Sequence, residues 1–182
     1  MDSIFSTPRK SALELGKIYF WTATIRNWQC LLLDDSFKMV ITSSLENLSS
    51  RKLIDVFAFV VMPNHIHLIW RLNKMNGAEL PSASLLKFTA HRFKKLLTPG
   101  ELAKYYVDAA NKSFEFWQRD SLGIELFSPN VAYQKLDYLH LNPLGEKWNL
   151  ATDPCGYKFS SASFYESGNT NFTFINHLGN EF

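Results

Sequence analysis

The sequence has little of what marks several large protein classes. Its two cysteines, Cys30 and Cys155, are too few for a disulfide scaffold and match no zinc-finger spacing. The most apolar run, residues 53–62, is ten residues long and contains Asp55, so it is too short to cross a membrane. No apolar run follows the first charged residues, which argues against a secretory signal. We therefore expect a cytoplasmic protein with no membrane partner.

Charge of one sign is also scarce. The 19 Lys and Arg residues against 17 Asp and Glu give a net charge of +2. Any surface that binds nucleic acid would therefore have to be a local cluster of positive charge. Hydrophobic residues make up 46% of the 182 residues, which excludes a disordered chain. A chain of this length can bury a core without disulfides, so the composition predicts a folded domain.

Hydrophobic patterning predicts an α+β fold. Runs rich in β-branched and aromatic residues predict four strands, over residues 17–25, 55–62, 65–72 and 113–119. Amphipathic spacing predicts three helices, over residues 33–50, 82–97 and 130–141, starting near Asp34 or Asp35, Ser82 or Ser84, and Asn130. Pro63 and Asn64 favour a turn between the middle strands. The order predicts a ferredoxin-like split βαβ fold, an antiparallel sheet with helices on one face, plus a C-terminal helix.

Two histidines begin the third predicted strand. Because strand side chains alternate, His65 and His67 point to one face of the sheet and Ile66 to the other. Two imidazoles about 7 Å apart along a strand can bind one divalent metal. The alternative is a pair of histidines at a strand edge that bond to backbone or water.

The last predicted helix carries a second candidate group. Tyr138 and Asn142 are four residues apart and therefore lie on one face, where a phenol stands beside an amide oxygen. The alternative is that Tyr138 packs in the core with its hydroxyl at the rim. If the helix supplies a tyrosine nucleophile, Tyr133 is the alternative to Tyr138, with Asp137 four residues on as its candidate oxygen ligand. His140 lies on another face of the helix, which favours a structural or DNA-facing role.

Together these segments resemble the single-tyrosine HUH transposases, and in particular the branch called REP-associated tyrosine transposases. The resemblance is carried, in order, by residues 22–24 (TAT), 62–69 (MPNHIHLI), 116–119 (FWQR), 138–143 (YLHLNP) and 157–162 (YKFSSA). It covers residues 17–165 as a nuclease domain and leaves residues 1–16 as an arm and 166–182 as a tail. Residues 144–148 (LGEKW) depart from the basic, glycine-containing segment that is usual in the family. The resemblance therefore does not predict whether this segment contacts DNA.

The resemblance implies an enzyme that nicks and rejoins single-stranded DNA near hairpin or palindromic repeats. It implies that His65, His67 and Asn142 bind Mg²⁺ or Mn²⁺. It assigns the nucleophile to Tyr138, which would form a covalent 5′-phosphotyrosine. It also favours a monomer over a dimer.

The predicted helix over residues 82–97 is basic and is a candidate DNA contact. Its cations are Lys87, Arg92, Lys94 and Lys95, which would bind phosphates or simply form a solvated face. The alternative to an enzyme is a ferredoxin-like module that binds single-stranded nucleic acid without cutting it. A relaxase or replication initiator that uses the same chemistry is a third reading. Trp70 and Trp148 could stack on bases, although burial is favoured for both.

Overall fold

The computed structural model describes residues 12–110 and 112–182, so most of the predicted N-terminal arm lies outside the described residues. The strands are β1 (Ile18–Thr24), β2 (Ile54–Val61), β3 (His65–Leu72), β4 (Tyr106–Ala109), β5 (Lys112–Phe114) and β6 (Leu122–Glu125). The helices are α1 (Asp35–Ser50), α2 (Pro81–Leu96), α3 (Pro99–Leu102), α4 (Pro129–Leu141) and α5 (Ala162–Ser167). None of the described helices combines the length and apolarity needed to cross a bilayer.

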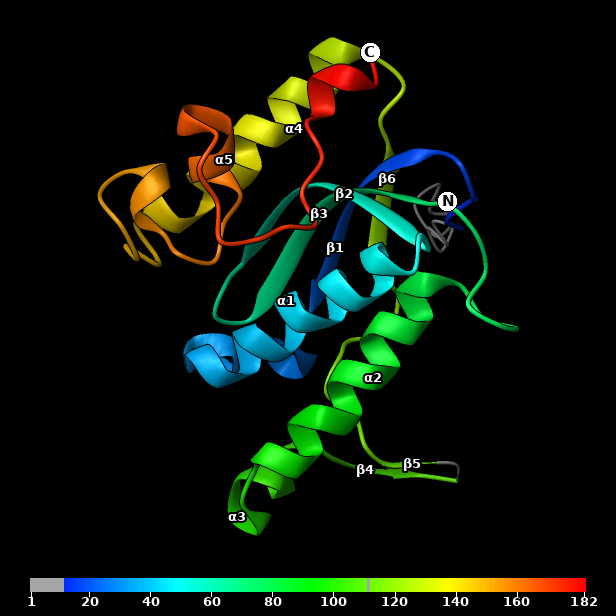
Figure 1. The fold of residues 1–182 in the computed structure, drawn as a ribbon. Helices are drawn as coiled ribbons and strands as arrows, with labels where there is room; N and C mark the ends of the chain where they lie inside the picture. The colour runs from blue at the N-terminus through cyan, green and yellow to red at the C-terminus, as the bar shows by residue number, and fades with distance from the viewer. Residues whose placement is uncertain (1–11, 111) are drawn as a thin grey trace, which may run out of the picture.

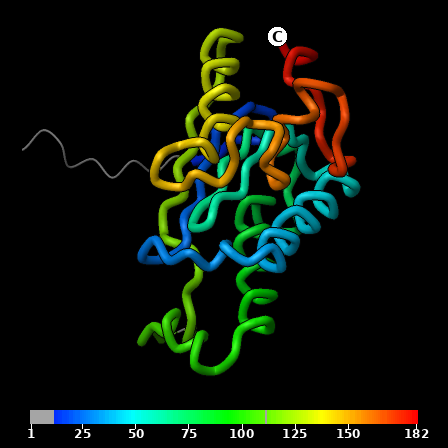
Figure 2. Tube along the Cα trace, turned by 90° about the vertical axis from the view of Figure 1, so that its left-hand side faces the viewer, coloured from blue at the N-terminus to red at the C-terminus, as the bar shows by residue number. Residues whose placement is uncertain are grey.

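A four-stranded sheet in the order β2-β3-β1-β6 forms the centre of the fold, and neighbouring strands are antiparallel. Helices α1 and α2 lie together on one side of this sheet, whereas α4 and α5 lie on the other (Figures 1 and 2). This arrangement confirms the predicted α+β fold with an added C-terminal helix.

The hairpin of β2 and β3 forms where the sequence predicts it. Its two apolar runs pair with Val61 opposite Ile66, and the Met62 N–H donates to the His65 carbonyl across 2.8 Å. Pro63 and Asn64 make the turn, as expected from their backbone preferences. The hairpin fixes the register of β3 and therefore decides which of its side chains face α4.

The core on the α1 and α2 side is apolar and aromatic. Trp21 of β1 and Trp70 of β3 are fully buried there, with ring centroids 4.8 Å apart. Phe93 of α2 packs on Phe37 of α1 and on Trp117. The burial of Trp70 agrees with the expectation that it packs in the core rather than on a base.

The fourth strand of the sheet lies later in the chain than the sequence predicts. Residues 113–119 alternate like a strand, but only their start pairs, through β5, with the neighbouring β4. The rest runs beside β1, with a single bridge between Trp117 and Ile25, and buries Phe116 and Trp117. The sheet instead takes β6, which lies at its edge and pairs with β1.

Two helix starts also differ from the prediction. Helix α2 begins at Pro81 and α4 at Pro129, because proline suits the first helical position, where no amide hydrogen is needed. The residue before Pro129 therefore caps α4: the Ser128 hydroxyl accepts from the Val131 N–H, and Asn130 does not cap. Helix α1 starts as predicted, with Asp34 accepting from the Ser36 N–H.

The predicted C-terminal tail packs along the outer edge of β2. Ile175 bridges Val56 in parallel, and the Asn176 N–H donates to the Val56 carbonyl across 2.8 Å. Leu178 is fully buried, and Glu181 forms an ion pair with Arg71 of β3. Residues 174–181 therefore complete the sheet edge (Figure 1).

Candidate active site

Strand β3 places the two histidines side by side on the face that α4 covers. Their ring centroids are 4.6 Å apart, and the His65 and His67 side chains are both buried. The neighbouring Ile66 points to the opposite face, as the alternation of a strand requires. The predicted pairing of the imidazoles on one face is therefore present in the structure.

Each imidazole is held by a polar neighbour that sequence reasoning missed. The His65 Nδ1 lies 2.7 Å from the amide oxygen of Asn64, and the His67 Nδ1 lies 2.8 Å from the Thr22 hydroxyl. Because an amide oxygen only accepts, the His65 Nδ1 carries the proton and its Nε2 keeps a lone pair. Thr22 stands opposite His67 in the β1–β3 pairing, which is the signal that could have found it.

Burial keeps both imidazoles uncharged near neutral pH. Burial, with a smaller contribution from the nearby Lys147, lowers the pKa of His65 to about 4, although the Asn142 side chain acts the other way. Burial likewise lowers the pKa of His67 to about 3, with smaller contributions from His65 and Lys135. Neutral imidazoles are the form that binds a metal.

Helix α4 brings Tyr138 and Asn142 to the same place. The Tyr138 ring lies 5.6 Å from the His67 ring and 5.9 Å from the Phe20 ring, yet half of its surface is exposed (51%). Asn142 starts the 3₁₀ turn at the end of α4 and lines the same hollow as His65. A phenol that solvent can reach therefore stands beside two imidazoles and an amide.

Two hollows flank the Tyr138 ring. One has a volume of about 300 Å³ and extends from His65 and Asn142 to Trp148, and the other, of about 390 Å³, extends from Phe20 to β6. Both are lined by Thr22, Thr24, Trp28, His67 and Tyr138. A chain that passes over Tyr138 would find space on each side of the phenol.

One lysine lines each hollow, and the sequence analysis identified neither of them. Lys135 lies one helical turn before Tyr138, with its ammonium 5.6 Å from the centre of that ring. Lys147 lies 4.9 Å from the centre of the Trp148 ring, in the segment whose DNA contacts the sequence left open. Trp148 is half-buried beside His65, with ring centroids 6.4 Å apart. Positive charge near the phenol thus comes from these lysines.

The rival tyrosine lies elsewhere on α4. The Tyr133 hydroxyl is directed at Gly179 of the C-terminal segment, so close that a β-carbon there would lie 2.9 Å away. Tyr133 is not among the described residues that line either hollow. His140 is buried and its Nε2 lies 2.8 Å from the Ser161 hydroxyl, which is a structural role.

The predicted DNA-binding lysines and arginine lie across the sheet from Tyr138. They are exposed on α2, which covers the other face, and are Lys87, Arg92, Lys94 and Lys95. Lys87 pairs with Glu79 at 3.7 Å, and Lys94 lies 4.9 Å from the centre of the Phe114 ring. The structure therefore does not bring this group together with the histidines.

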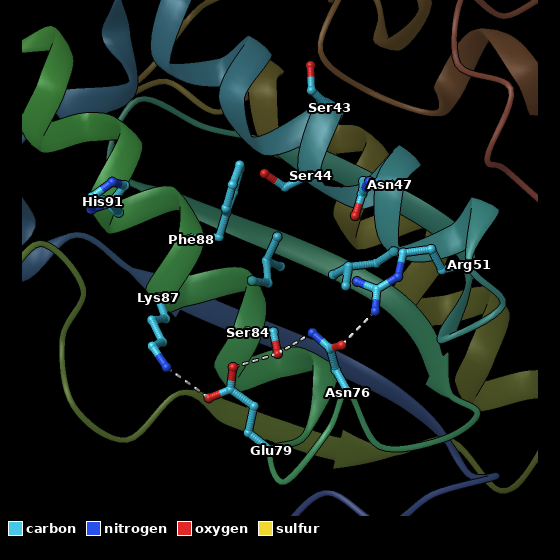
Figure 3. Close-up of a pocket in the computed structure, with 12 residues that line it drawn as sticks. Ser43, Ser44, Asn47, Arg51, Asn76, Glu79, Ser84, Lys87, Phe88 and His91 are labelled. Atoms are coloured by element: carbon cyan, nitrogen blue, oxygen red, sulfur yellow. Dashed lines mark hydrogen bonds and ion pairs between the residues drawn. The ribbon is translucent and has the colours of Figure 1, made fainter.

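A larger groove of about 640 Å³ opens between α1 and α2 (Figure 3). Its polar side chains bond to one another: Arg51 donates to Asn76, Asn76 donates to Ser84, and Ser84 donates to Glu79. Phe88 reaches into it with about half of its surface exposed. Because Arg51, Asn76, Ser84 and Glu79 are already engaged with one another, the size of the groove alone does not make it an active site.

The donor set around His65 fits a divalent metal. Two neutral imidazoles and the Asn142 amide oxygen are ligands that Mn²⁺ and, less tightly, Mg²⁺ accept. Among the described residues, no three His, Cys, Asp or Glu side chains gather, so the third ligand would have to be this amide. Thr22 and Asn64 would orient the two imidazoles, as hydrogen-bond partners of metal ligands do.

Comparison with known proteins bears on the fold. No family model matches the chain, and no curated protein matches its sequence. A solved structure of a REP-associated tyrosine transposase bound to a REP hairpin is similar, with a TM-score of 0.62 and 18% identity over 94% of this chain and 98% of that one. The fold is that of a REP-associated tyrosine transposase. The resemblance predicted from the sequence motifs is therefore confirmed at the level of the fold.

A second solved structure, from Deinococcus radiodurans and described as a transposase, has a TM-score of 0.42. It shares 15% identity over 73% of this chain and 94% of that one. This likeness is too low to carry an argument.

Proposed function

We propose that this chain is a metal-dependent endonuclease and strand transferase for single-stranded DNA. The observation that carries the proposal is the meeting of Tyr138 with His65, His67 and Asn142, from two elements far apart in sequence, at one pair of hollows. The fold shared with a transposase that was solved with a REP hairpin supports DNA near hairpin repeats as the substrate.

The proposed nucleophile is the Tyr138 hydroxyl. Its oxygen forms a bond to the phosphorus of a phosphodiester, the bond from phosphorus to the 3′ oxygen breaks, and the phenolic proton is passed on to the leaving 3′ oxygen. The products are a 5′-phosphotyrosine and a free 3′-hydroxyl. A 3′-hydroxyl that attacks this linkage restores a phosphodiester and frees Tyr138, so strands can be rejoined without a nucleotide cofactor.

His65, His67 and Asn142 would bind Mg²⁺ or Mn²⁺, which would polarise the phosphate and stabilise the charge that develops during attack. Thr22 and Asn64 hold the imidazole planes, so the donors do not have to be ordered when DNA binds. Lys135 and Lys147 supply positive charge for the phosphates on either side of Tyr138. Contact between the α2 cations and more distant phosphates stays a prediction.

The decisive experiment looks for the covalent adduct. Labelled single-stranded hairpin oligonucleotides, including the repeats that flank the protein's own gene, are incubated with the protein and Mn²⁺ or Mg²⁺ and separated on a denaturing protein gel. We expect a labelled protein band that requires metal and disappears in Tyr138→Phe and His65→Ala. Tyr133→Phe is the matched control, because it removes a hydroxyl from the same helix, and it should keep the band.

Other outcomes point elsewhere. An adduct that persists in Tyr138→Phe and is lost in Tyr133→Phe would transfer the nucleophile to Tyr133. Tight binding with no adduct in any metal would favour the non-catalytic module that binds single-stranded nucleic acid.

A further inference from the structure

Trp28 is an exposed aromatic residue at the junction of the two hollows. It lines both of them, and 59% of its surface is exposed. Among the described residues, no other ring or cation lies against its indole, in contrast to Trp148, which Lys147 and His65 contact. A large exposed ring that lines both hollows is available to pack against a ligand with an apolar face.

The backbone holds this ring in an unusual position. Trp28 has φ +56° and the preceding Asn27 has φ +54°, a left-handed conformation that a bulky side chain rarely adopts. This conformation costs free energy and persists only where the surrounding structure enforces it. Residues of this kind are often found at ligand sites. The strain therefore points to a role for the place that the indole occupies.

The loop that carries Trp28 is fixed to the site at several points. The Asn64 side chain donates to the Trp28 carbonyl across 3.2 Å while its oxygen accepts from His65. The Ile25 N–H donates to the Asn64 carbonyl across 2.8 Å, and the Arg26 N–H donates to Phe116 across 2.7 Å. Asn64 thus ties the Trp28 backbone to a candidate metal ligand, and the loop does not have to be ordered when a ligand binds.

The charges nearby fit a nucleic acid strand. In the smaller hollow, Lys147 is the one lysine among the described lining residues, which include no arginine, aspartate or glutamate. In the larger hollow, Lys135 is accompanied by Asp120. A strand crossing both hollows would have its backbone near Lys147 and Tyr138, and a base within reach of Trp28. Unpaired bases stack on exposed indoles irrespective of sequence.

We propose that Trp28 is a stacking platform for one unpaired DNA base next to the phosphate that Tyr138 attacks. This inference rests on the proposed function and adds a positioning contact to it. The ring would hold the strand open at the cleavage point and set which nucleotide spans the two hollows.

Binding of two chemically matched strands tests the stacking directly. The probes are a fluorescein-labelled thymidine homopolymer of about 15 nucleotides and an abasic chain of equal length, with affinity measured by anisotropy in EDTA at low salt. Trp28→Asn removes the ring but suits the left-handed backbone, whereas Trp28→Phe keeps a ring. Phe88→Gln is the matched control, since it removes an exposed ring from α2 on the other face of the sheet.

The wild type should bind the thymidine strand more tightly than the abasic one. Trp28→Asn should weaken binding of the thymidine strand about 5- to 150-fold and leave the abasic strand unchanged, while Trp28→Phe retains most of the affinity. Phe88→Gln should change neither. Equal binding of both strands by the wild type, or an equal loss on both in Trp28→Asn, would overturn the inference.

The same variants separate this inference from the proposed function. A ring-dependent preference for bases without any covalent adduct would retain the platform and reject the nuclease. An adduct that forms equally well in Trp28→Asn, together with equal binding of both strands, would retain the nuclease and reject the platform.

Discussion

The two faces of the central sheet differ in chemistry although the same strands form both. On β3, His65 and His67 face α4, whereas Ile66 and Leu68 face α1 and α2. The α1 and α2 side is a closed apolar core, while the α4 side carries hydrogen-bonded imidazoles beside an exposed phenol. Both faces bury apolar side chains, but the α4 face also accommodates polar groups whose burial costs stability.

Hollows on the two sides show the same contrast. The groove between α1 and α2 is the larger, but its polar groups satisfy one another (Figure 3). The smaller hollows around Tyr138 combine neutral imidazoles, an amide and cations. The chemistry of the lining, rather than the volume, therefore identifies the candidate site.

The largest expected effect on stability comes from the apolar face. Leu68→Ala should lower the free energy of unfolding by about 2–5 kcal/mol, because Leu68 is fully buried and the cavity would be only partly filled. Urea unfolding measures this loss. Adduct formation by the fraction that remains folded should be unchanged, and a loss of adduct out of proportion to unfolding would show that the two faces are not separable.

Acid should lower the stability of the protein through a buried histidine on the α4 side of the sheet. Burial lowers the pKa of His140 to about 4, below its ordinary 6.5. Between these values the unfolded chain binds one more proton than the folded chain, so stability is complete above pH 6.5 and falls as the pH drops towards 4. For this residue the loss amounts to about 3 kcal/mol.

His140→Gln isolates that contribution in metal-free protein. Gln keeps a polar group near Ser161 but does not titrate, so the free energy of unfolding should fall less steeply with acid, by about 1.4 kcal/mol per pH unit. Urea unfolding at a series of pH values measures the slope. Identical slopes in both proteins would contradict the assignment.

A smaller effect is expected from the hydroxyl that orients His67. Thr22→Val keeps the shape of the side chain but loses the 2.8 Å hydrogen bond to the His67 Nδ1. We expect Mn²⁺ affinity, measured by calorimetry, to fall about 10- to 100-fold. Thr22→Ser keeps the hydroxyl and should keep the affinity, whereas an unchanged affinity in Thr22→Val would contradict the role of the hydrogen bond.

The smallest effect distinguishes the cations of the two faces. Lys135→Gln should reduce the slope of log affinity for single-stranded DNA against log salt by about 0.7, the value for one lost phosphate contact. Lys87→Gln, on α2, should leave that slope unchanged for a short strand, because it lies across the sheet from Tyr138. The reverse result would place the strand on the α2 face.

The sequence was sufficient to predict the histidine face because its signals are local. A two-residue alternation and a Pro63-Asn64 turn determine the β2–β3 hairpin, and a four-residue spacing determines which residues of α4 stand beside Tyr138. These are short-range rules that hold before any tertiary packing is known.

What the sequence did not predict depends on tertiary partners. Residues 113–119 have the composition of a strand, but their ring side chains pack on α2 while the shorter β6 pairs with β1. Lys135 and Lys147 show no periodic pattern, and only the fold brings them to one site. Trp28 was missed for the same reason, since its exposure depends on a loop that Asn64 holds.

The register of β3 makes the site sensitive to changes in length. One residue inserted between Asn64 and His65 would turn both imidazoles towards Trp21 and bring apolar side chains to Tyr138. Substitutions can alter this site gradually, but an insertion or deletion here would remove it in one step. Variation in length among descendants of this chain is therefore expected in segments such as residues 73–80, which join the elements, and not at the turn that sets the histidines.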